Sequence, residues 1–302
     1  MTTKKIYEVI IIGGSFAGLS AAMALGRSLR QVLIIDSNQP CNRKAPHSHN
    51  FITQDGKTPK EITEVAKQQV LKYSTVNFIN DLAIRGNRTH YGFEITTLSG
   101  EIFTSKKLLF ATGVVDQMLP IEGFSECWGI SVVPCPYCHG YEFKNKTIGL
   151  LANGDLGFEL SRLLYNWSKD LILFTNGKSL VTKEHTEKIK SHGIKINEKE
   201  IAVLEHTNGN IASVVFKDGS KEKVDAIFAR ISHQQHCTIP QELGCEITEQ
   251  SFIKTDEFGK TSIPGIFVAG DNSSIFRSVS FATASGTKAG AFMNKEFIEE
   301  TF

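Results

Sequence analysis

Two cysteines, Cys135 and Cys138, stand in the run Val-Pro-Cys-Pro-Tyr-Cys-His-Gly-Tyr-Glu at residues 133–142. Two intervening residues keep both sulfurs close enough to bond. Thiol–disulfide exchange needs one sulfur that the substrate can reach and a second that resolves the mixed disulfide. His139 follows directly, and a neighbouring imidazolium lowers the pKa of a thiol. The pattern therefore predicts a redox-active cysteine pair.

Three other uses of this motif stay open at this point. Cys135-x-x-Cys138-His139 also matches the attachment motif of c-type haem, which requires export, and we expect no signal peptide here. A zinc site needs two further ligands, but the sequence has no second Cys-x-x-Cys and no His-x-x-x-His, so we expect no metal. Two inert core thiols are the third possibility, although Pro136 and Gly140 fit an exposed turn better than a packed strand.

A glycine-rich loop precedes the cysteine pair and predicts a nucleotide site. An apolar run at residues 8–12 leads into the loop, a helical stretch covers 19–28, and a second apolar run at 32–35 ends in Asp36. In such a β-turn-α-β unit, glycines let the backbone approach a pyrophosphate at the helix N-terminus, and the carboxylate accepts from ribose hydroxyls. The candidate cofactor residues are Gly13, Ser15, Phe16, Ala17, Gly18 and Asp36.

Two later segments extend this predicted site. Residues 108–113 form an apolar run that ends in Ala111, Thr112 and Gly113, whose small size permits close backbone approach. Residues 265–271 read as a short buried strand that runs into Gly270 and Asp271. These segments imply a nucleotide domain built from both ends of the chain.

A second β-turn-α-β pattern lies between them. Residues 146–151 form its first strand, 152–157 its turn and 171–174 its second strand. We therefore predict an α/β protein with two Rossmann-like (three-layer ββα) nucleotide-binding domains, the second inserted into the first. The expected FAD-binding domain comprises 1–116 and 237–302, and the inserted NAD(P)-binding-like domain comprises 117–236 and carries the cysteine pair.

These segments together resemble the low-molecular-weight thioredoxin reductase family of FAD flavoproteins over nearly the whole chain. The resemblance rests on the loop at 13–18, Asn50-Phe51, residues 111–113, Trp128-Gly129 before the cysteine pair, and Gly270-Asp271. Within the superfamily, Cys-Pro-Tyr-Cys-His-Gly-Tyr-Glu looks closer to the branch of gliotoxin- and holomycin-type dithiol oxidases than to ordinary thioredoxin reductases, which carry Cys-Ala-Thr-Cys-Asp.

The resemblance implies one FAD per subunit, a redox-active disulfide in the inserted domain and a homodimer. Cys138 would contact the flavin, Cys135 would exchange with the substrate, and His139 would replace the family's proton-transferring Asp. Residues 277–286 should lead into a helix whose N-terminus stabilises negative charge on the reduced flavin. The further cofactor contacts that the resemblance adds are Asn50, Ser280, Phe281 and Ala282.

The inserted domain departs from the reductases that use NADPH. Those carry a G-x-G-x-x-A loop and a His-Arg-Arg cluster after the second strand, whereas this chain has Ala152 at the first glycine and Thr-Asn-Gly-Lys-Ser at 175–179. A 2′-phosphate prefers a guanidinium, and NADH recognition prefers a carboxylate at this strand end. Whether NADPH or NADH binds stays open, and with it the direction of electron flow.

The sequence therefore predicts an FAD-dependent thiol/disulfide oxidoreductase that cycles a Cys135–Cys138 disulfide. We favour a nicotinamide-independent, dithiol-oxidase-like enzyme. An NAD(P)H-dependent thioredoxin-disulfide reductase is the alternative, and a non-enzymatic flavin redox sensor is a second one. The substrate partner would be a thioredoxin-like protein or a small dithiol or disulfide.

Composition excludes some classes of partner. The 302 residues are 41% hydrophobic and 22% charged, and the net charge is +1, so no electrostatic attraction to nucleic acid or an anionic membrane is expected. The N-terminal apolar run is too short for a membrane span or a signal-peptide core, and we expect a cytoplasmic protein. The other four cysteines, at 41, 127, 237 and 245, are expected to be buried structural thiols.

Several titratable residues near these motifs receive less active roles. His47 and His49 are expected to form a solvated loop pair, with proton transfer beside the flavin as the alternative. His233 and His236 fall at the predicted return linker. Glu142 is expected at the exposed start of the next strand rather than in catalysis.

Overall fold

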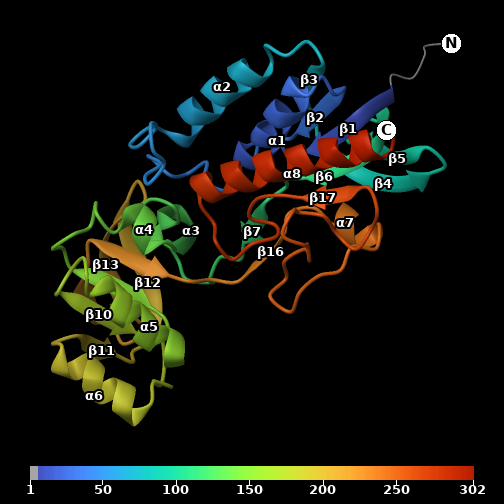
Figure 1. Ribbon diagram of the computed structural model, residues 1–302. Coiled ribbons are helices and arrows are strands. Elements are labelled where there is room, and N and C mark those ends of the chain that lie inside the picture. Colours follow the sequence, from blue (N-terminus) through green and yellow to red (C-terminus); the bar gives the residue numbers. More distant parts are fainter. Residues whose placement is uncertain (1–5) are drawn as a thin grey trace. The chain divides into compact units, whose positions relative to one another are not determined.

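The computed structural model describes residues 6–302 and divides into two compact units (Figure 1). The first unit comprises the described residues up to Arg43, Lys57–Val115 and His233–Phe302. The second comprises Lys44–Gly56 and Asp116–Ser232. Residues 44–56 thus group with the second unit, whereas the sequence placed them in the first.

A mixed sheet forms the centre of the first unit, with strand order β3-β2-β1-β6-β5-β4 and β17 also paired to β6. Parallel pairing joins β1 to β2 and β6, β2 to β3, and β17 to β6, while β4 and β5 form an antiparallel hairpin next to β6. The strands are β1 (Ile6–Ile12), β2 (Val32–Asp36), β3 (Val76–Asn80), β4 (Ala83–Thr89), β5 (Gly92–Thr97), β6 (Ile102–Phe110) and β17 (Ile266–Val268).

The helices of this unit are α1 (Phe16–Arg27), α2 (Pro59–Val70), α7 (Ile239–Glu242) and α8 (Val279–Glu299). Helix α8 runs beside α1 (Figure 1). A Cβ atom at Gly286 would lie 2.0 Å from the carbonyl oxygen of Ala17, and one at Gly290 would lie 2.7 Å from that of Ala21. The two glycines therefore allow the helix backbones to touch, which joins the two ends of the chain in one unit.

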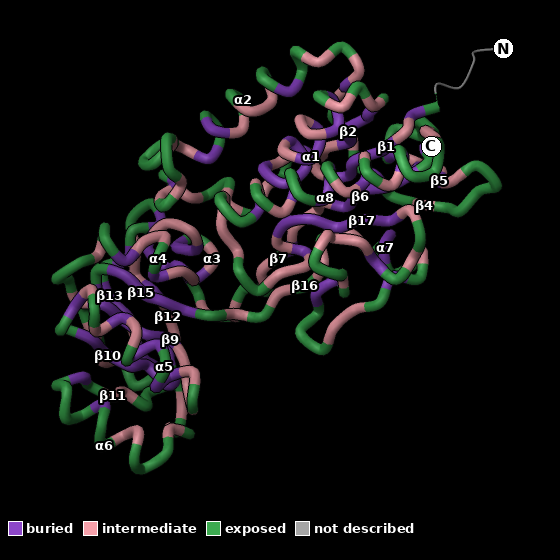
Figure 2. The backbone as a smooth tube through the Cα atoms, in the orientation of Figure 1, coloured by how far each residue is buried: buried purple, intermediate pink, exposed green. Residues whose placement is uncertain are grey.

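Burial explains why the central strands are almost continuously apolar. Ile10, Leu33 and Phe110 are fully buried, and buried backbone runs through β1, β2, β6 and β17 (Figure 2). Parallel strands covered on both faces require apolar side chains on both faces, rather than the alternation of a half-exposed strand.

The second unit contains an all-parallel sheet of order β11-β10-β9-β15-β8 and an antiparallel sheet of order β12-β13-β14. Its strands are β8 (Val132–Val133), β9 (Ile148–Leu151), β10 (Leu171–Phe174), β11 (Lys195–Asn197), β12 (Ile201–Thr207), β13 (Asn210–Phe216), β14 (Lys221–Lys223) and β15 (Ala226–Ala229). Its helices are α3 (Phe124–Cys127), α4 (Pro136–His139), α5 (Gly154–Leu164) and α6 (Lys183–Ser191).

The two chain crossings between the units pair with each other, because β7 (Val114–Asp116) and β16 (His233–Gln235) form a two-stranded sheet. The predicted α/β class, with a second Rossmann-like unit inserted into the first, is confirmed. Within residues 6–302, every helix is too short or too polar to cross a membrane.

Candidate functional site

The glycine-rich turn of the first unit brings backbone close to the N-terminus of α1. Gly13 has φ of +102°, and a Cβ there would lie 2.3 Å from the carbonyl oxygen of Ala111. Only glycine fits this position without strain. The backbones of two predicted cofactor segments, 13–18 and 111–113, therefore meet at the carboxyl ends of β1 and β6.

Asp36 closes the same turn from the end of β2. Its carboxylate accepts hydrogen bonds from the backbone amides of Gly14 (2.9 Å) and Asn38 (3.2 Å). Ser15 is the N-cap residue of α1, and its side chain makes no capping hydrogen bond within the described part of the chain. Helix N-termini whose first amides are not capped by a side chain are the kind that can bind a phosphate.

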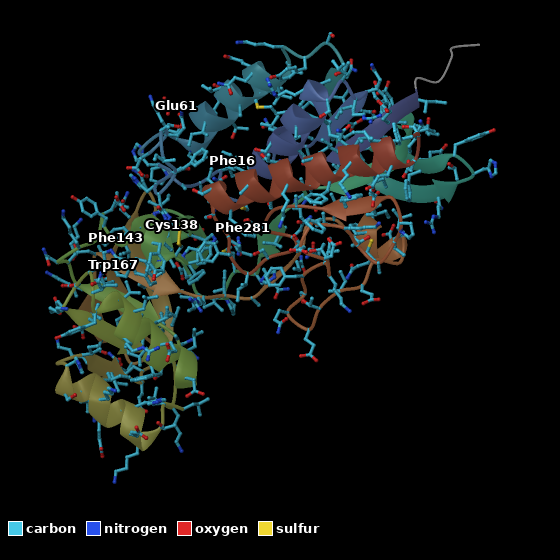
Figure 3. The ribbon with its side chains drawn as sticks, in the orientation of Figure 1. Phe16, Glu61, Cys138, Phe143, Trp167 and Phe281 are labelled. Carbon is cyan, nitrogen blue, oxygen red and sulfur yellow. A yellow bond between two sulfur atoms is a disulfide. The ribbon has the colours of Figure 1, made fainter. Side chains whose placement is uncertain are left out.

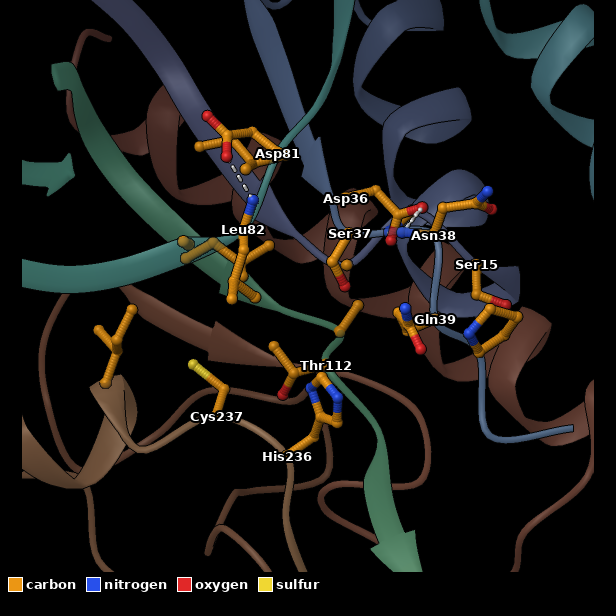
Figure 4. A pocket seen from close by; sticks show the side chains of 18 of the residues that line it. Ser15, Asp36, Ser37, Asn38, Gln39, Asp81, Leu82, Thr112, His236 and Cys237 are labelled. Carbon is orange, nitrogen blue, oxygen red and sulfur yellow. Dashed lines mark hydrogen bonds between the residues drawn. The ribbon is translucent and has the colours of Figure 1, made fainter. Parts of the chain in front are cut away.

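A cavity of about 260 Å³ opens beside this turn. In Figure 4, Ser15 and Asp36 lie on one side of it, and His236 and Cys237 lie on another, near Thr112. The predicted cofactor residues that line it are Gly13, Ser15, Asp36, Ala111 and Thr112. His236, which the sequence assigned only to a linker, therefore belongs to the wall of this cavity.

The other predicted cofactor residues of this unit do not line the cavity. Gly18 packs inside it, since a Cβ there would lie 1.9 Å from the carbonyl oxygen of Gly13. Asp271 Oδ2 lies 3.5 Å from Arg277 Nε and accepts a hydrogen bond from the thiol of Cys41 at 3.8 Å. The remaining members lie at the starts of α1 and α8 or at strand ends, namely Phe16, Ala17, Gly113, Gly270, Ser280, Phe281 and Ala282.

Asn272 is a candidate site residue that the sequence analysis did not identify. Its side chain is fully buried, and its Nδ2 donates to Phe110 O (3.0 Å) and Thr112 Oγ1 (3.2 Å). Its Oδ1 is buried and has no hydrogen-bond partner among residues 6–302. A buried amide oxygen without a donor is costly, so this acceptor fits a site completed by a ligand or a water.

The cysteine pair lies in the second unit and forms a disulfide, with the two Cα atoms 5.3 Å apart. Pro136 opens the short helix α4, and the amide of Cys138 donates to Cys135 Sγ at 3.2 Å. A Cβ at Gly140 would lie 2.9 Å from the indole of Trp167, so this glycine lets the motif lie against the ring. Cys138 and Trp167 are both labelled on this unit in Figure 3.

His139 ends α4 and is only partly exposed. Burial lowers its pKa to about 4, against an opposing contribution from the nearby carboxylate of Glu142 and with a smaller lowering contribution from His49. The imidazole is therefore neutral at physiological pH. A neutral imidazole next to Cys138 can accept a proton, but it supplies no standing positive charge to activate the thiol, which corrects the expected imidazolium.

Glu142 is exposed, as expected, but His49 is less solvated than the expected loop pair. His49 Nε2 lies 3.5 Å from Glu142 Oε1, and His49 Nδ1 lies 3.6 Å from Asp55 Oδ2. The His49 side chain is 22% exposed, so it is not a freely solvated loop residue. Glu142 lies in the turn before β9 and faces this histidine. No spacing rule predicts the contact, because 93 residues separate the two.

Asn50, a predicted flavin contact, lies in the same 44–56 segment of the second unit. It adopts φ of +59°, and its backbone amide donates to Asp55 Oδ1 at 2.8 Å. Asn50 therefore groups with the second unit, whereas the other predicted cofactor residues group with the first.

The turn of the second nucleotide fold differs from that of the first in its hydrogen bonds. Asn153 Oδ1 accepts from the backbone amides of Gly154 (2.8 Å) and Leu180 (2.7 Å). Its Nδ2 donates to the carbonyl oxygens of Thr175 (3.2 Å) and Lys178 (3.0 Å). One side chain therefore caps α5 and ties its turn to the loop after β10.

Of the four remaining cysteines, two match the expected buried role, and Cys237 is partly exposed and lines the cavity. Cys127 and Cys245 are buried, and burial raises their pKa values. Burial also raises the pKa of Cys237 to about 11. Cys41 is exposed, so the expectation of a buried thiol was wrong there.

Comparisons with known proteins agree with this arrangement. The pyridine nucleotide-disulphide oxidoreductase family matches residues 7–286. Thioredoxin reductase tcpT of Claviceps purpurea is 29% identical over 311 residues, which cover 99% of this chain and 97% of that protein. The crystal structure of a putative thioredoxin reductase, TrxB, from Bacillus anthracis has a TM-score of 0.94 at 30% identity and covers 98% of this chain and 100% of that one.

A third similarity is to HlmI, whose crystal structure has a TM-score of 0.91 at 27% identity and covers 97% of this chain and 93% of that one. The family model spans far more than half of the chain, and the Cys135–Cys138 disulfide lies within the matched residues. The chain therefore belongs to the pyridine nucleotide-disulphide oxidoreductase family and is a thioredoxin reductase-like disulfide oxidoreductase with a flavin- and pyridine-nucleotide-binding fold.

Proposed function

We propose that this enzyme oxidises dithiols through its Cys135–Cys138 disulfide with bound FAD and without a nicotinamide cofactor. The observation that carries the proposal is the contrast between its two nucleotide turns. The first leaves the N-cap side chain of α1 without a capping hydrogen bond. The second uses Asn153 to cap α5 and to hold the loop after β10 across the turn.

The residues of the first unit fit FAD. Gly13 gives a backbone that no other residue type would allow, the α1 N-terminus offers amides for a pyrophosphate, and Asp36 stands where ribose hydroxyls would donate. The buried Oδ1 of Asn272 adds an acceptor that still needs a donor. When bound, FAD would supply the two-electron acceptor that restores the disulfide.

The second unit fits a nicotinamide dinucleotide poorly. A pyrophosphate in the second turn would compete with Asn153 for the amide of Gly154. The loop after β10 is held further by Glu198, whose Oε1 accepts from Ser179 N at 2.7 Å. Displacing the Asn153 side chain would leave several backbone groups unpaired, each of which costs about 1–3 kcal/mol if it stays buried.

The chain's own residues account for the exchange. A substrate thiol attacks one sulfur of the pair, forms a mixed disulfide and releases the other sulfur, while its proton passes to neutral His139. The second substrate thiol then breaks the mixed disulfide. The substrate leaves as a disulfide, and Cys135 and Cys138 hold the two electrons. Oxygen or another two-electron acceptor would complete the cycle.

The substrate we propose is a small dithiol rather than a thioredoxin-like protein. Tyr137, between the two cysteines, is 61% exposed, and Tyr141, just after them, is 68% exposed. These rings offer an apolar surface beside the reactive disulfide, and such a surface suits a compact apolar molecule. A homodimer remains part of the proposal on the family resemblance, and a cytoplasmic location remains part of it as the sequence expectation.

An NAD(P)H-dependent thioredoxin reductase is the second candidate. The names of two of the similar proteins favour it, and Gly154, with φ of +59°, and Gly157 are retained in the second turn. In such an enzyme, electrons would run from the nicotinamide toward a disulfide substrate.

Oxygen uptake tests the proposal. Purified holoenzyme is mixed in air with dithiothreitol and no nicotinamide, while dissolved oxygen and oxidised dithiothreitol are measured. We expect catalytic consumption of both reactants, which Cys135→Ser should abolish. If dithiothreitol is oxidised no faster than by the Cys135→Ser control, the dithiol-oxidase proposal fails.

A further inference from the structure

An exposed turn that carries two lysines follows the redox motif on the second unit. The chain turns continuously over residues 140–145, and the side chains of Lys144 and Lys146 are both exposed. Lys144 Nζ lies 3.7 Å from the centroid of the Tyr141 ring, and Lys146 Nζ lies 5.6 Å from that of Phe143. A cation is attracted to the face of an aromatic ring, which favours positions of both ammonium groups close to the turn.

Trp167 joins this turn to the cysteine pair. Its ring centroid lies 5.7 Å from that of Tyr137, which stands between the two cysteines. Its carbonyl oxygen accepts a hydrogen bond from the backbone amide of Asn145 at 3.0 Å. The next residue, Ser168, donates its hydroxyl to the carbonyl oxygen of Lys146 at 2.6 Å. The lysine-bearing turn and the redox motif are therefore packed against the same aromatic segment.

The charges of these two lysines are not neutralised within the unit. Across residues 6–302, neither ammonium group has a carboxylate oxygen at ion-pair distance. By contrast, Lys199, Lys217 and Lys221 of the same unit each pair with a carboxylate. The turn next to the redox motif therefore presents two positive charges that can bind an anion.

Two carboxylates lie on the same segments, and both have other partners. Glu142 Oε1 lies 3.5 Å from His49 Nε2. Asp170 Oδ2 accepts a hydrogen bond from the hydroxyl of Thr147 at 2.5 Å. Neither carboxylate therefore takes the place that an anionic ligand would occupy at the two lysines.

We propose that the small dithiol oxidised by this enzyme carries a carboxylate, which Lys144 and Lys146 bind while its two thiols react at the cysteine pair. The inference rests on the proposed function and deepens it, because it names the class of substrate. The carbon chain between the carboxylate and the thiols would lie on the exposed rings of Tyr137 and Tyr141, whose apolar faces suit aliphatic carbon.

The exchange balances without a further reactant. The two S–H bonds of the dithiol and the Cys135–Cys138 bond are replaced by one S–S bond in the product and two thiols on the protein. Two electrons and two protons pass from the substrate to the protein. The carboxylate and the two lysines keep their charges throughout, so the lysines contribute to binding of the substrate and not to the bond changes.

Dihydrolipoate and dihydrolipoamide test the proposal, because they share one dithiol and one carbon chain and differ in a single terminal charge. Holoenzyme is mixed anaerobically with each dithiol, and the second-order rate constant of flavin bleaching is measured. An exposed ion pair changes binding by about 1.5- to 5-fold, so two pairs predict a preference for dihydrolipoate of about fivefold at low salt. The preference should fall as salt screens the charges.

Paired variants assign the preference to the turn. Lys144→Gln combined with Lys146→Gln should lower the rate constant for dihydrolipoate to that for dihydrolipoamide. Both positions are exposed, so the fold should tolerate the change. Lys183→Gln combined with Lys190→Gln removes the same charge from exposed positions of α6 and is the matched control. The control should keep the preference.

Equal or slower bleaching of wild type by dihydrolipoate would overturn the proposal, as would a preference that survives in the Lys144 and Lys146 variant. An equal loss with both dithiols in that variant would overturn it too, because the lysines would then act on the disulfide and not on the carboxylate. If neither dithiol bleaches wild type, the proposed dithiol oxidation itself has failed.

Discussion

Asn153 Oδ1 accepts the backbone amide of Leu180 at 2.7 Å, which links the turn after β9 to the loop after β10. In a Rossmann-like fold, a dinucleotide lies at the carboxyl ends of these two strands. The chain fills this position with its own amide side chain. Ser15, at the corresponding turn of the first unit, makes no side-chain capping hydrogen bond among the described residues, so the two copies of one architecture differ at the N-terminus of their first helix.

Asn153→Ala should destabilise the second unit. The variant loses an N-cap and three further hydrogen bonds, and loss of an N-cap alone costs about 0.5–2 kcal/mol. Urea unfolding followed by circular dichroism measures the change. Asn87→Ala, at an exposed position of β4, is the control and should stay within about 0.5 kcal/mol of wild type. Equal stability of the two variants would refute the loop-tying role of Asn153.

Cys138→Ser should abolish dithiol-dependent bleaching of the flavin and leave FAD bound. The serine hydroxyl cannot form a disulfide with Cys135, whereas the expected cofactor residues of the first unit are untouched. Absorbance spectra before and after anaerobic dithiothreitol report both properties. The control Cys127→Ala removes a thiol outside the pair, and its flavin should still be bleached by dithiothreitol. Bleaching by Cys138→Ser at the wild-type rate would exclude the disulfide from the electron path.

The rate of dithiol oxidation should depend weakly on pH between about 5 and 7.5. Because burial lowers the pKa of His139 to about 4, its imidazole remains a neutral proton acceptor over this range. If only free thiolate reacted, the rate would instead fall about tenfold for each pH unit below the thiol pKa. Single-turnover rates with dithiothreitol, measured across this pH range, give the pH dependence. His139→Gln should show the steep pH dependence of free thiolate. A steep slope in wild type would remove His139 from the reaction.

Glu296→Gln should lower the free energy of unfolding at neutral pH. It should also make that free energy vary less as the pH falls. Burial opposes ionisation of Glu296, but hydrogen bonds from Lys107 (2.7 Å) and Lys260 (2.6 Å) outweigh it and lower the Glu296 pKa. A carboxyl with a lowered folded pKa stabilises the fold above its unfolded pKa of 4.5, and this stabilisation is lost as pH falls through the folded value.

Charge-assisted hydrogen bonds contribute about 1.5–3 kcal/mol each, so a loss of about 2 kcal/mol at pH 7 is expected for Glu296→Gln. Urea midpoints at pH 7 and pH 3.5 measure it, with Glu299→Gln, an exposed neighbour on α8, as the control. A loss as large at pH 3.5 as at pH 7 would mean that the carboxylate charge is not the cause.

Thiol labelling of the reduced native protein should separate its cysteines into fast-reacting and slow-reacting groups. Exposed Cys41 and the opened pair should react with iodoacetamide at pH 8, whereas Cys237, with its pKa raised to about 11 by burial, is only about a thousandth ionised there. Buried Cys127 and Cys245 should also resist. Peptide mass spectrometry after timed quenching gives the order, and early labelling of Cys237 would contradict the burial.

Local patterns predicted most of the architecture. The strand ending at Asp36, the turn at Gly13 and the redox motif at Cys135 all come from residues that are close in sequence, where spacing carries the physical constraint. The same patterns predicted two nucleotide units with one inserted in the other, because each unit repeats a strand–turn–helix–strand signature.

Contacts between distant segments escaped prediction. His49 meets Glu142 only after residues 44–56 group with the second unit, and the lowered pKa of His139 follows from burial that no motif reports. His236 lines the cavity beside Asp36 because β16 returns to the first unit. In the sequence, the turn around Asn153 only departs from the usual glycine-rich loop. The four hydrogen bonds of Asn153 depend on the loop after β10, which the sequence does not place.

The most direct measurement is an anaerobic titration of the purified yellow protein with NADPH, then NADH, then dithiothreitol, while the oxidised-flavin absorbance is followed. The Asn153 link and the Cys135–Cys138 disulfide predict no bleaching by either nicotinamide, bleaching by the dithiol, and return of the absorbance when air is admitted. Rapid bleaching by NADPH or NADH would contradict the account and make the protein a nicotinamide-dependent disulfide reductase.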